Sequence, residues 1–112
     1  MLQRLKKKDP DPREISNAEA AKAYEEQGAT FVDVREPDEW AEGHMPGALH
    51  IPLGDLVRRE NEIPHGGKIV TVCRIGVRSL DAVEILRRTG RKDVKSMAGG
   101  MIEWTKNGRA VE

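Results

Sequence analysis

The sequence predicts an α/β fold, a three-layer domain with a mainly parallel central sheet flanked by helices. Short apolar runs suited to strands occur at residues 30–34, 68–72 and 93–97. Helical patterns, at residues 16–28 and 79–90, precede the first and the third of these runs. Because strands that alternate with helices at this spacing are typical of βαβ units, we expect the strands to run parallel.

Length and composition limit the classes of protein to which the chain can belong. Its 112 residues suit one domain with a single core. Nineteen basic and nineteen acidic residues cancel, so composition favours neither nucleic acid nor an acidic membrane as partner. A single cysteine excludes an intramolecular disulfide, and no zinc-ligand spacing is present. With no signal-like or membrane-spanning apolar stretch, we expect a cytoplasmic protein.

The first third of the chain has clear helix signals. Residues 1–13 are expected to form an N-terminal arm, with a basic cluster at Lys6–Lys8 and prolines that exclude a continuous helix, and residues 14–112 the domain. Ser16 and Glu19 have the spacing of a capping box, which predicts a helix running to Gly28. A strand over 30–34 follows.

The middle and end of the chain continue the alternation. We expect a helical turn over 37–43, a strand over 48–51, a helical turn over 53–59 and a loop over 61–67. Residues 68–72 then form a strand and residues 79–90 a helix that stops at Gly90. The last strand, 93–97, leads through a glycine pair into a helix that contains Trp104 and stops near Asn107 and Gly108.

Cys73 is the candidate nucleophile. It stands at the C-terminal edge of the strand over 68–72, where α/β sheets collect ligands and where the following helix presents unpaired amides. These amides, together with Arg74 and Arg78, should favour the thiolate, and Gly76 allows the loop to curl. A lone cysteine is commonly only a small buried apolar residue. Two arginines and a glycine within five residues favour the reactive interpretation instead.

Four segments in the expected order carry a resemblance to the rhodanese (sulfurtransferase) family, over about residues 15–108. Residues 73–79, CRIGVRS, resemble that family's active-site loop. Residues 31–40, FVDVREPDEW, resemble its "DVRE…EW" segment, and residues 43–52, GHMPGALHIP, its "GHIPGA…IP" segment. Residues 99–104, GGMIEW, resemble its terminal "GG…W". The resemblance implies the same α/β architecture.

The predicted chemistry is sulfur transfer through a persulfide on Cys73. The thiolate would attack the outer sulfur of a small anionic donor such as thiosulfate, and a thiophilic acceptor would then remove the sulfur. Arg74 and Arg78 would hold the donor's oxyanion. The backbone of Arg74, Ile75, Gly76, Val77, Arg78 and Ser79 would form the substrate-binding loop. No metal or organic cofactor is required.

Asp33 and Arg35 fall on the same sheet edge as Cys73 if the strands are parallel. Arg35 could face the substrate, or it could pair with Asp33, Glu36 or Asp38, and we prefer the structural role. Asp33 is expected to anchor nearby backbone donors. The three histidines, His44, His50 and His65, lack metal-ligand spacing and are expected to be structural or exposed; packing roles are expected for Trp40, Trp104, Met97 and Met101.

Two alternatives remain open. A cysteine-dependent phosphatase or arsenate reductase uses similar parts, but its loop has five residues between cysteine and arginine, whereas four separate Cys73 from Arg78 here. The second is a sulfur relay or partner-binding module with little thiosulfate turnover. Ile75 and Val77 are apolar where small or polar residues are frequent in the family. We therefore expect a more hydrophobic entrance to the site, and the identity of the sulfur acceptor stays open.

Overall fold

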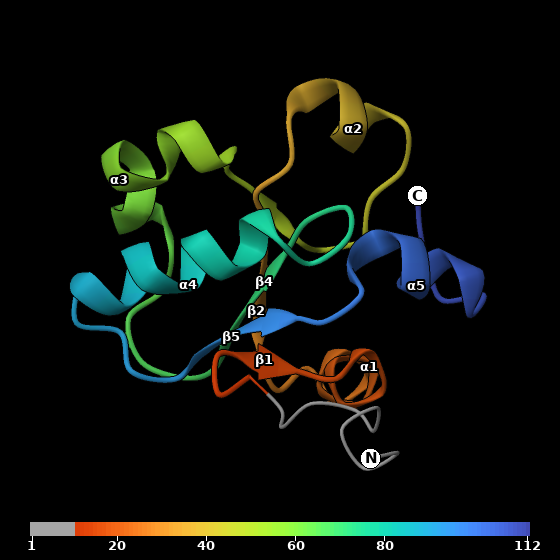
Figure 1. Cartoon of the computed structure of the whole chain (residues 1–112), viewed down its shortest axis with the longest axis horizontal. Coiled ribbons are helices and arrows are strands. Elements are labelled where there is room, and N and C mark those ends of the chain that lie inside the picture. Colours follow the sequence, from red (N-terminus) through yellow and green to blue (C-terminus); the bar gives the residue numbers. More distant parts are fainter. Residues whose placement is uncertain (1–10) are drawn as a thin grey trace, which may run out of the picture.

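The computed structural model describes residues 11–112, which form a five-stranded sheet with helices on both faces (Figure 1). The strand order is β1-β5-β4-β2-β3, and every pairing is parallel. The strands are β1 (Glu14–Ile15), β2 (Thr30–Asp33), β3 (Leu49–His50), β4 (Ile69–Val72) and β5 (Val94–Met97). The α/β architecture expected from the sequence is therefore confirmed.

The helices connect these strands as the alternating pattern predicted. They are α1 (Asn17–Glu25), α2 (Pro37–Ala41), α3 (Leu56–Arg59), α4 (Arg78–Arg88) and α5 (Gly100–Lys106), with 3-10 turns at Leu53–Asp55 and Glu60–Glu62. Ser16 is the N-cap of α1, since its hydroxyl accepts the Glu19 amide at 3.0 Å, and the Glu19 carboxylate accepts the Ser16 hydroxyl, not the Ser16 amide of the predicted capping box. The Ser16 side chain satisfies an amide that the helix cannot pair itself, and so fixes where α1 begins.

The N-terminal strand β1 was not predicted. At the β1–β5 edge of the sheet, the Ser96 amide donates to the Arg13 carbonyl at 2.7 Å, and the Ala98 amide donates to the Ile15 carbonyl at 2.9 Å. Two residues are too few to show a strand pattern in the sequence. The basic cluster Lys6–Lys8 lies outside the described residues.

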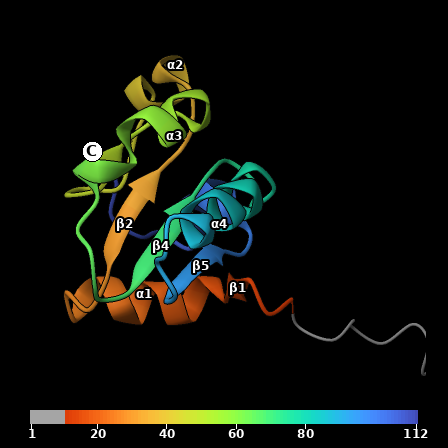
Figure 2. The same cartoon turned by 90° about the vertical axis from the view of Figure 1, so that its left-hand side faces the viewer.

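Each face of the sheet has its own hydrophobic core. Helices α3 and α4 cover one face, and α1 and α5 cover the other (Figures 1 and 2). The first core holds Val32, Val34, Ile51, Leu56, Ile63, Ile69, Cys73, Ala82, Val83, Leu86 and Val94. The second holds Ala20, Ala21, Phe31, Met45, Val70, Val72, Met97, Met101 and Trp104. Sheet faces that are both covered explain why β4 is buried along its whole length, with Thr71 as its one polar residue.

The register of β2 against β4 positions the site. Asp33 pairs with Val72, so the two strands end together and the residues after them meet at one edge of the sheet. The loop from β4 to α4 lies at this edge, between α4 and the start of α5, with α2 above it in Figure 1. Within residues 11–112, no helix has the length and apolar character that a membrane span requires.

Candidate active site

Cys73 directly follows β4, and its side chain is buried. Its sulfur accepts the backbone amides of Gly76 at 3.1 Å and Ser79 at 3.3 Å. Helix α4 has no side-chain cap at its first turn, so the sulfur takes the position that a capping oxygen would otherwise occupy. Amide donors and the positive end of the helix dipole stabilise negative charge at this position.

The loop between Cys73 and α4 depends on glycine at position 76. Gly76 has a φ of 95°, a conformation that residues with a Cβ rarely adopt. A Cβ there would also lie 3.1 Å from the Gly99 nitrogen. The expectation that Gly76 lets the loop curl is confirmed by this backbone geometry.

A row of hydroxyl groups extends from the sulfur into the sheet. The Cys73 sulfur and the Ser79 hydroxyl oxygen are 3.3 Å apart, and the Ser79 and Ser96 hydroxyl oxygens are 2.6 Å apart. Ser79 and Ser96 are fully buried. Thr71 donates to the Ser79 carbonyl at 2.8 Å and so holds the start of α4 against β4. When the sulfur is a thiolate, this row can deliver a hydroxyl hydrogen bond to it.

The start of α5 supports the loop from the other side. The Met101 amide donates to the Cys73 carbonyl at 2.9 Å, and the Ile102 amide donates to the Arg74 carbonyl at 3.0 Å. Gly100 makes this approach possible, because a Cβ there would lie 2.6 Å from the Cys73 carbonyl oxygen. Asn17 at the start of α1 donates to the Ala98 and Gly100 carbonyls at 3.0 and 3.2 Å, and thereby holds the glycine pair.

Arg78 at the start of α4 is paired with a carboxylate from α2. Its guanidinium donates to the two oxygens of Glu39 at 2.7 and 2.8 Å. This pair lowers the pKa of Glu39 to about 2, and the hydrogen bonds to Glu39 raise the pKa of Arg78. The charge of Cys73 also contributes to raising the pKa of Arg78, as expected for a cation beside the sulfur.

Arg35 pairs with Asp33, and both side chains are buried. The Arg35 guanidinium donates to the two carboxylate oxygens at 2.8 to 3.0 Å, and Asp33 also accepts the Arg35 backbone amide at 3.0 Å. Further bonds reach the carbonyls of Glu39 and Gly43, at 3.2 and 2.9 Å. Arg35 thus has the structural pairing preferred from the sequence, and it holds the middle of α2 and the turn after it beside the site.

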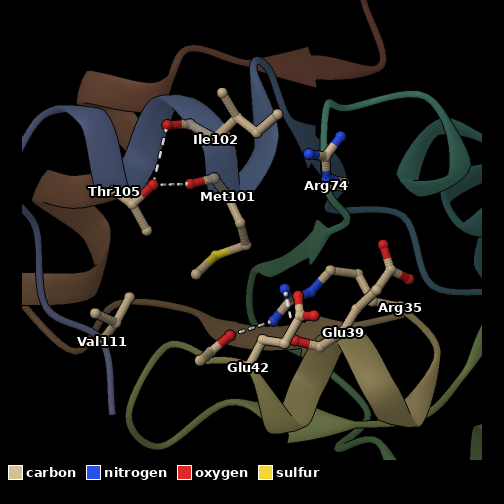
Figure 3. Close-up of a pocket in the computed structure, with 9 residues that line it drawn as sticks. Arg35, Glu39, Glu42, Arg74, Met101, Ile102, Thr105 and Val111 are labelled. Carbon is tan, nitrogen blue, oxygen red and sulfur yellow. Dashed lines mark hydrogen bonds between the residues drawn. The ribbon is translucent and has the colours of Figure 1, made fainter.

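Arg74 is exposed and lines a pocket of about 210 Å³ at the start of α5 (Figure 3). Among residues 11–112 it has no carboxylate at ion-pair distance. In Figure 3, Met101 projects into the space between the α5 residues and the charged group formed by Arg35, Glu39 and Glu42. The remaining lining residues are Gly43, Ile102, Thr105 and Val111. The pocket therefore combines paired charges with apolar side chains.

The other two loop side chains are exposed and apolar. Ile75 is 56% exposed and Val77 is 59% exposed, so neither contributes much to the core. They lie within four residues of Cys73 and give the outer surface of the loop a hydrophobic character. This exposure agrees with the more hydrophobic entrance to the site that was expected from the sequence.

His44, His50 and both tryptophans have packing roles, whereas His65 is exposed. Trp40 stacks between His44 and His50, with ring centroids 3.6 and 4.5 Å away. His44 and His50 also contact backbone carbonyls, those of Trp40 and Arg35. Trp104 is buried and packs edge-on against Tyr24. Within residues 11–112, no three histidine, cysteine or carboxylate side chains converge as metal ligands would.

Three supporting residues were missed from the sequence. Glu39 lies 39 positions from its partner Arg78, and only the folded chain brings them together. Of the three, only Ser96 could have been found from the sequence, because it is a polar residue in an otherwise mostly apolar strand. Asn17 was considered only as part of the first helix, and no local pattern connects it with Ala98 or Gly100.

Comparison with known proteins agrees with this geometry. A model of the rhodanese-like domain family matches residues 16–107. The putative sulfurtransferase YtwF of Bacillus subtilis is 36% identical over 82% of this chain and 89% of its own length. The putative sulfur carrier protein YrkF of the same organism is 36% identical over 75% of this chain, but the match spans 45% of its length. The chain thus spans about half the length of the first relatives that it matches.

A solved structure has the same fold. The crystal structure of a rhodanese-related protein from Thermoplasma volcanium superposes with a TM-score of 0.81 at 29% sequence identity. The superposition covers 89% of this chain and 97% of that one. Sequence and structure comparison therefore point to the same family.

Proposed function

The chain belongs to the rhodanese-like domain family, and from this premise we propose that it is a sulfurtransferase that carries sulfur as a persulfide on Cys73. One observation supports the proposal most directly. The Cys73 sulfur accepts two backbone amides at the start of α4, which is an environment that favours a thiolate. Such a thiolate is a nucleophile of the kind that sulfur transfer requires.

The proposed reaction has two half-reactions. In the first, the Cys73 thiolate attacks the outer sulfur of an anionic donor such as thiosulfate; a new sulfur–sulfur bond forms, the donor's own bond breaks, and sulfite leaves with the electron pair. In the second, a thiophilic acceptor attacks the outer sulfur of the persulfide, and Cys73 leaves as a thiolate. No oxidant or reductant is consumed, because the sulfane sulfur only changes its partner.

The residues around Cys73 have separate roles in this mechanism. The amides of the loop from Arg74 to Ser79 stabilise negative charge on the terminal sulfur of the persulfide. Arg74 is exposed at the pocket, where its guanidinium can contact a donor. Asp33 and Arg35 hold α2 beside the loop and support the site without contacting the sulfur.

A sulfur relay is the second candidate. The exposed apolar side chains of Ile75 and Val77 favour it, because they suit contact with a protein acceptor better than contact with a small anion. The relative YrkF is named a putative sulfur carrier protein. In a relay, Cys73 would still carry the persulfide, and only the acceptor would differ.

Intact mass spectrometry after incubation with thiosulfate tests the persulfide. The wild-type protein should gain the mass of one sulfur atom, and cyanide should remove it as thiocyanate. Cys73→Ser should gain nothing while it keeps the wild-type circular dichroism spectrum. Comparable sulfur loading of Cys73→Ser would overturn the mechanism.

A second measurement separates the two candidate functions. The rate at which cyanide removes sulfur from the Cys73 persulfide is compared with the rate at which a protein thiol removes it. Faster removal by the protein thiol supports the relay.

A further inference from the structure

Three arginines surround the site, and two of them are neutralised by carboxylates. Arg35 is paired with Asp33 in the interior, and Arg78 is paired with Glu39 through two hydrogen bonds of 2.7 and 2.8 Å. Only Arg74 has no carboxylate partner among the described residues. The cationic character that the sequence suggests is therefore much reduced in the folded protein.

The pairing of Arg78 also occupies the end-on pair of N–H groups on its two terminal nitrogens. A guanidinium binds an oxyanion through two parallel N–H groups, and Arg78 already presents such a pair to Glu39. Glu39 is held in place independently, because its carboxylate accepts the Glu36 amide at 3.0 Å in the capping box of α2. A small oxyanion that binds this end-on pair would have to displace a positioned carboxylate from Arg78.

Carboxylates also balance the positive charge of the arginines that line the pocket. Glu42 lines the pocket together with Arg74, and Glu39 lines it together with Arg35. Within this group the acidic side chains therefore equal the arginines in number. A dianion gains little from such a balanced surface, since the attraction to each cation is offset by repulsion from a nearby carboxylate.

Three apolar side chains line the same pocket. Met101, Ile102 and Val111 line it together with Arg74, the residue after Cys73, and the Met101 amide donates to the Cys73 carbonyl. An organic group attached to the transferred sulfur would find dispersion contacts here, and thiosulfate has no such group.

We propose that Glu39 is a specificity-determining residue, which disfavours small dianions by neutralising Arg78, and that the preferred sulfur donor is an organic persulfide, R–S–SH. This inference rests on the proposed function, of which it specifies the donor class. The Cys73 thiolate attacks the outer sulfur of R–S–SH, the donor's sulfur–sulfur bond breaks, and R–S⁻ leaves. The proton stays on the transferred sulfur, so that Cys73–S–SH is formed and charge is conserved.

The test compares the rates at which Cys73 is loaded by thiosulfate and by cysteine persulfide. Loading is stopped by alkylation at timed intervals and measured as the gain of one sulfur atom in the intact mass. For the wild-type protein, the rate constant with cysteine persulfide should exceed that with thiosulfate by at least about tenfold. Glu39→Gln should raise the thiosulfate-to-persulfide ratio by about tenfold, because it frees the charge of Arg78 while its amide oxygen still accepts the Glu36 amide.

Glu42→Gln is the matched control. It removes the same charge from the same pocket, but Glu42 does not contact Arg78, so the ratio should change by less than about threefold. High salt should reduce the gain produced by Glu39→Gln, because the effect is electrostatic. The assignment of Glu39 would be overturned if Glu39→Gln and Glu42→Gln had equal thiosulfate-to-persulfide rate ratios. It would also be overturned if a folded Glu39→Gln protein had a lower ratio than the wild-type protein.

The failure of this inference is distinguishable from failure of the proposed function. A wild-type protein that is loaded by thiosulfate at least as fast as by cysteine persulfide would remain a sulfurtransferase, and only the donor class would be wrong. A wild-type protein that is loaded by neither donor would contradict the proposed function and the inference with it.

Discussion

The hydroxyl oxygens of Ser79 and Ser96 lie 2.6 Å apart, and Ser79 in turn lies 3.3 Å from the Cys73 sulfur. A residue of β5 is thereby connected to the nucleophile through one intervening side chain. All three residues are buried, so water does not compete for these hydrogen bonds. Ser96 can orient the Ser79 hydroxyl and leave its proton directed to the thiolate.

Ser96→Ala should make Cys73 less reactive. Without its partner, the Ser79 hydroxyl is free to rotate, and the thiolate loses an oriented donor. We expect the rate of alkylation by iodoacetamide at neutral pH to fall by about threefold. Ser96→Thr retains a hydroxyl and should restore part of the effect. An alkylation rate for Ser96→Ala that equals the wild-type rate would refute this role.

Gly100→Ala should disrupt the loop and destabilise the protein. Its φ is 60°, and a Cβ would collide with the backbone of Cys73 and Arg74. Backbone cannot move aside as a flexible side chain can, so we expect a loss of about 2–4 kcal/mol in the free energy of unfolding, measured in urea. Sulfur loading should fall with it.

Gly108→Ala is the control for backbone strain alone. Gly108 has a similar φ of 72°, but a Cβ there would have no neighbour within 4 Å. Its substitution should cost only about 1 kcal/mol and leave the loading rate unchanged. If both variants lose the same stability, the close approach of α5 to the loop is not what requires glycine at position 100.

The Glu39–Arg78 pair should stabilise the protein in a defined pH range. The hydrogen bonds from Arg78 lower the pKa of Glu39 from 4.5 to about 2. The folded state therefore binds this proton less readily than the unfolded state, so the pair's contribution is complete above pH 4.5 and is lost as the pH falls towards 2.

The stability of Glu39→Gln relative to wild type measures this contribution. Because both side chains are partly exposed, we expect a wild-type advantage of about 1–2 kcal/mol at neutral pH, from urea unfolding at low salt. The difference should shrink between pH 4.5 and 2. A difference that does not change with pH would show that the pair does not couple to folding in this way.

Leu86→Ala should be strongly destabilising, because Leu86 is fully buried between α4 and the sheet. We expect a loss of about 2–5 kcal/mol in the free energy of unfolding. Val57→Ala is the matched substitution on the surface, since Val57 is 72% exposed, and it should change stability by less than about 0.5 kcal/mol. Similar losses for the two variants would contradict the assignment of the core on this face.

Local sequence determined the strand, loop and helix around Cys73. The apolar run before the cysteine, the glycine at position 76 and the helical pattern after it are short-range signals, and each describes the conformation of its own residues. The N-cap residue Ser16 is another such signal. The order of four family-like segments was also readable from the sequence, and the match of the family model to residues 16–107 confirms it.

Tertiary structure decided which groups meet at the site. Arg78 is a cation in the sequence, but the fold brings Glu39 from α2 against it and removes much of its charge. Ser96, Asn17 and the glycine pair act on the loop from β5, α1 and α5, because the sheet order places β5 beside β4. Such contacts depend on the spatial arrangement of distant segments, and a local pattern carries no information about the partner.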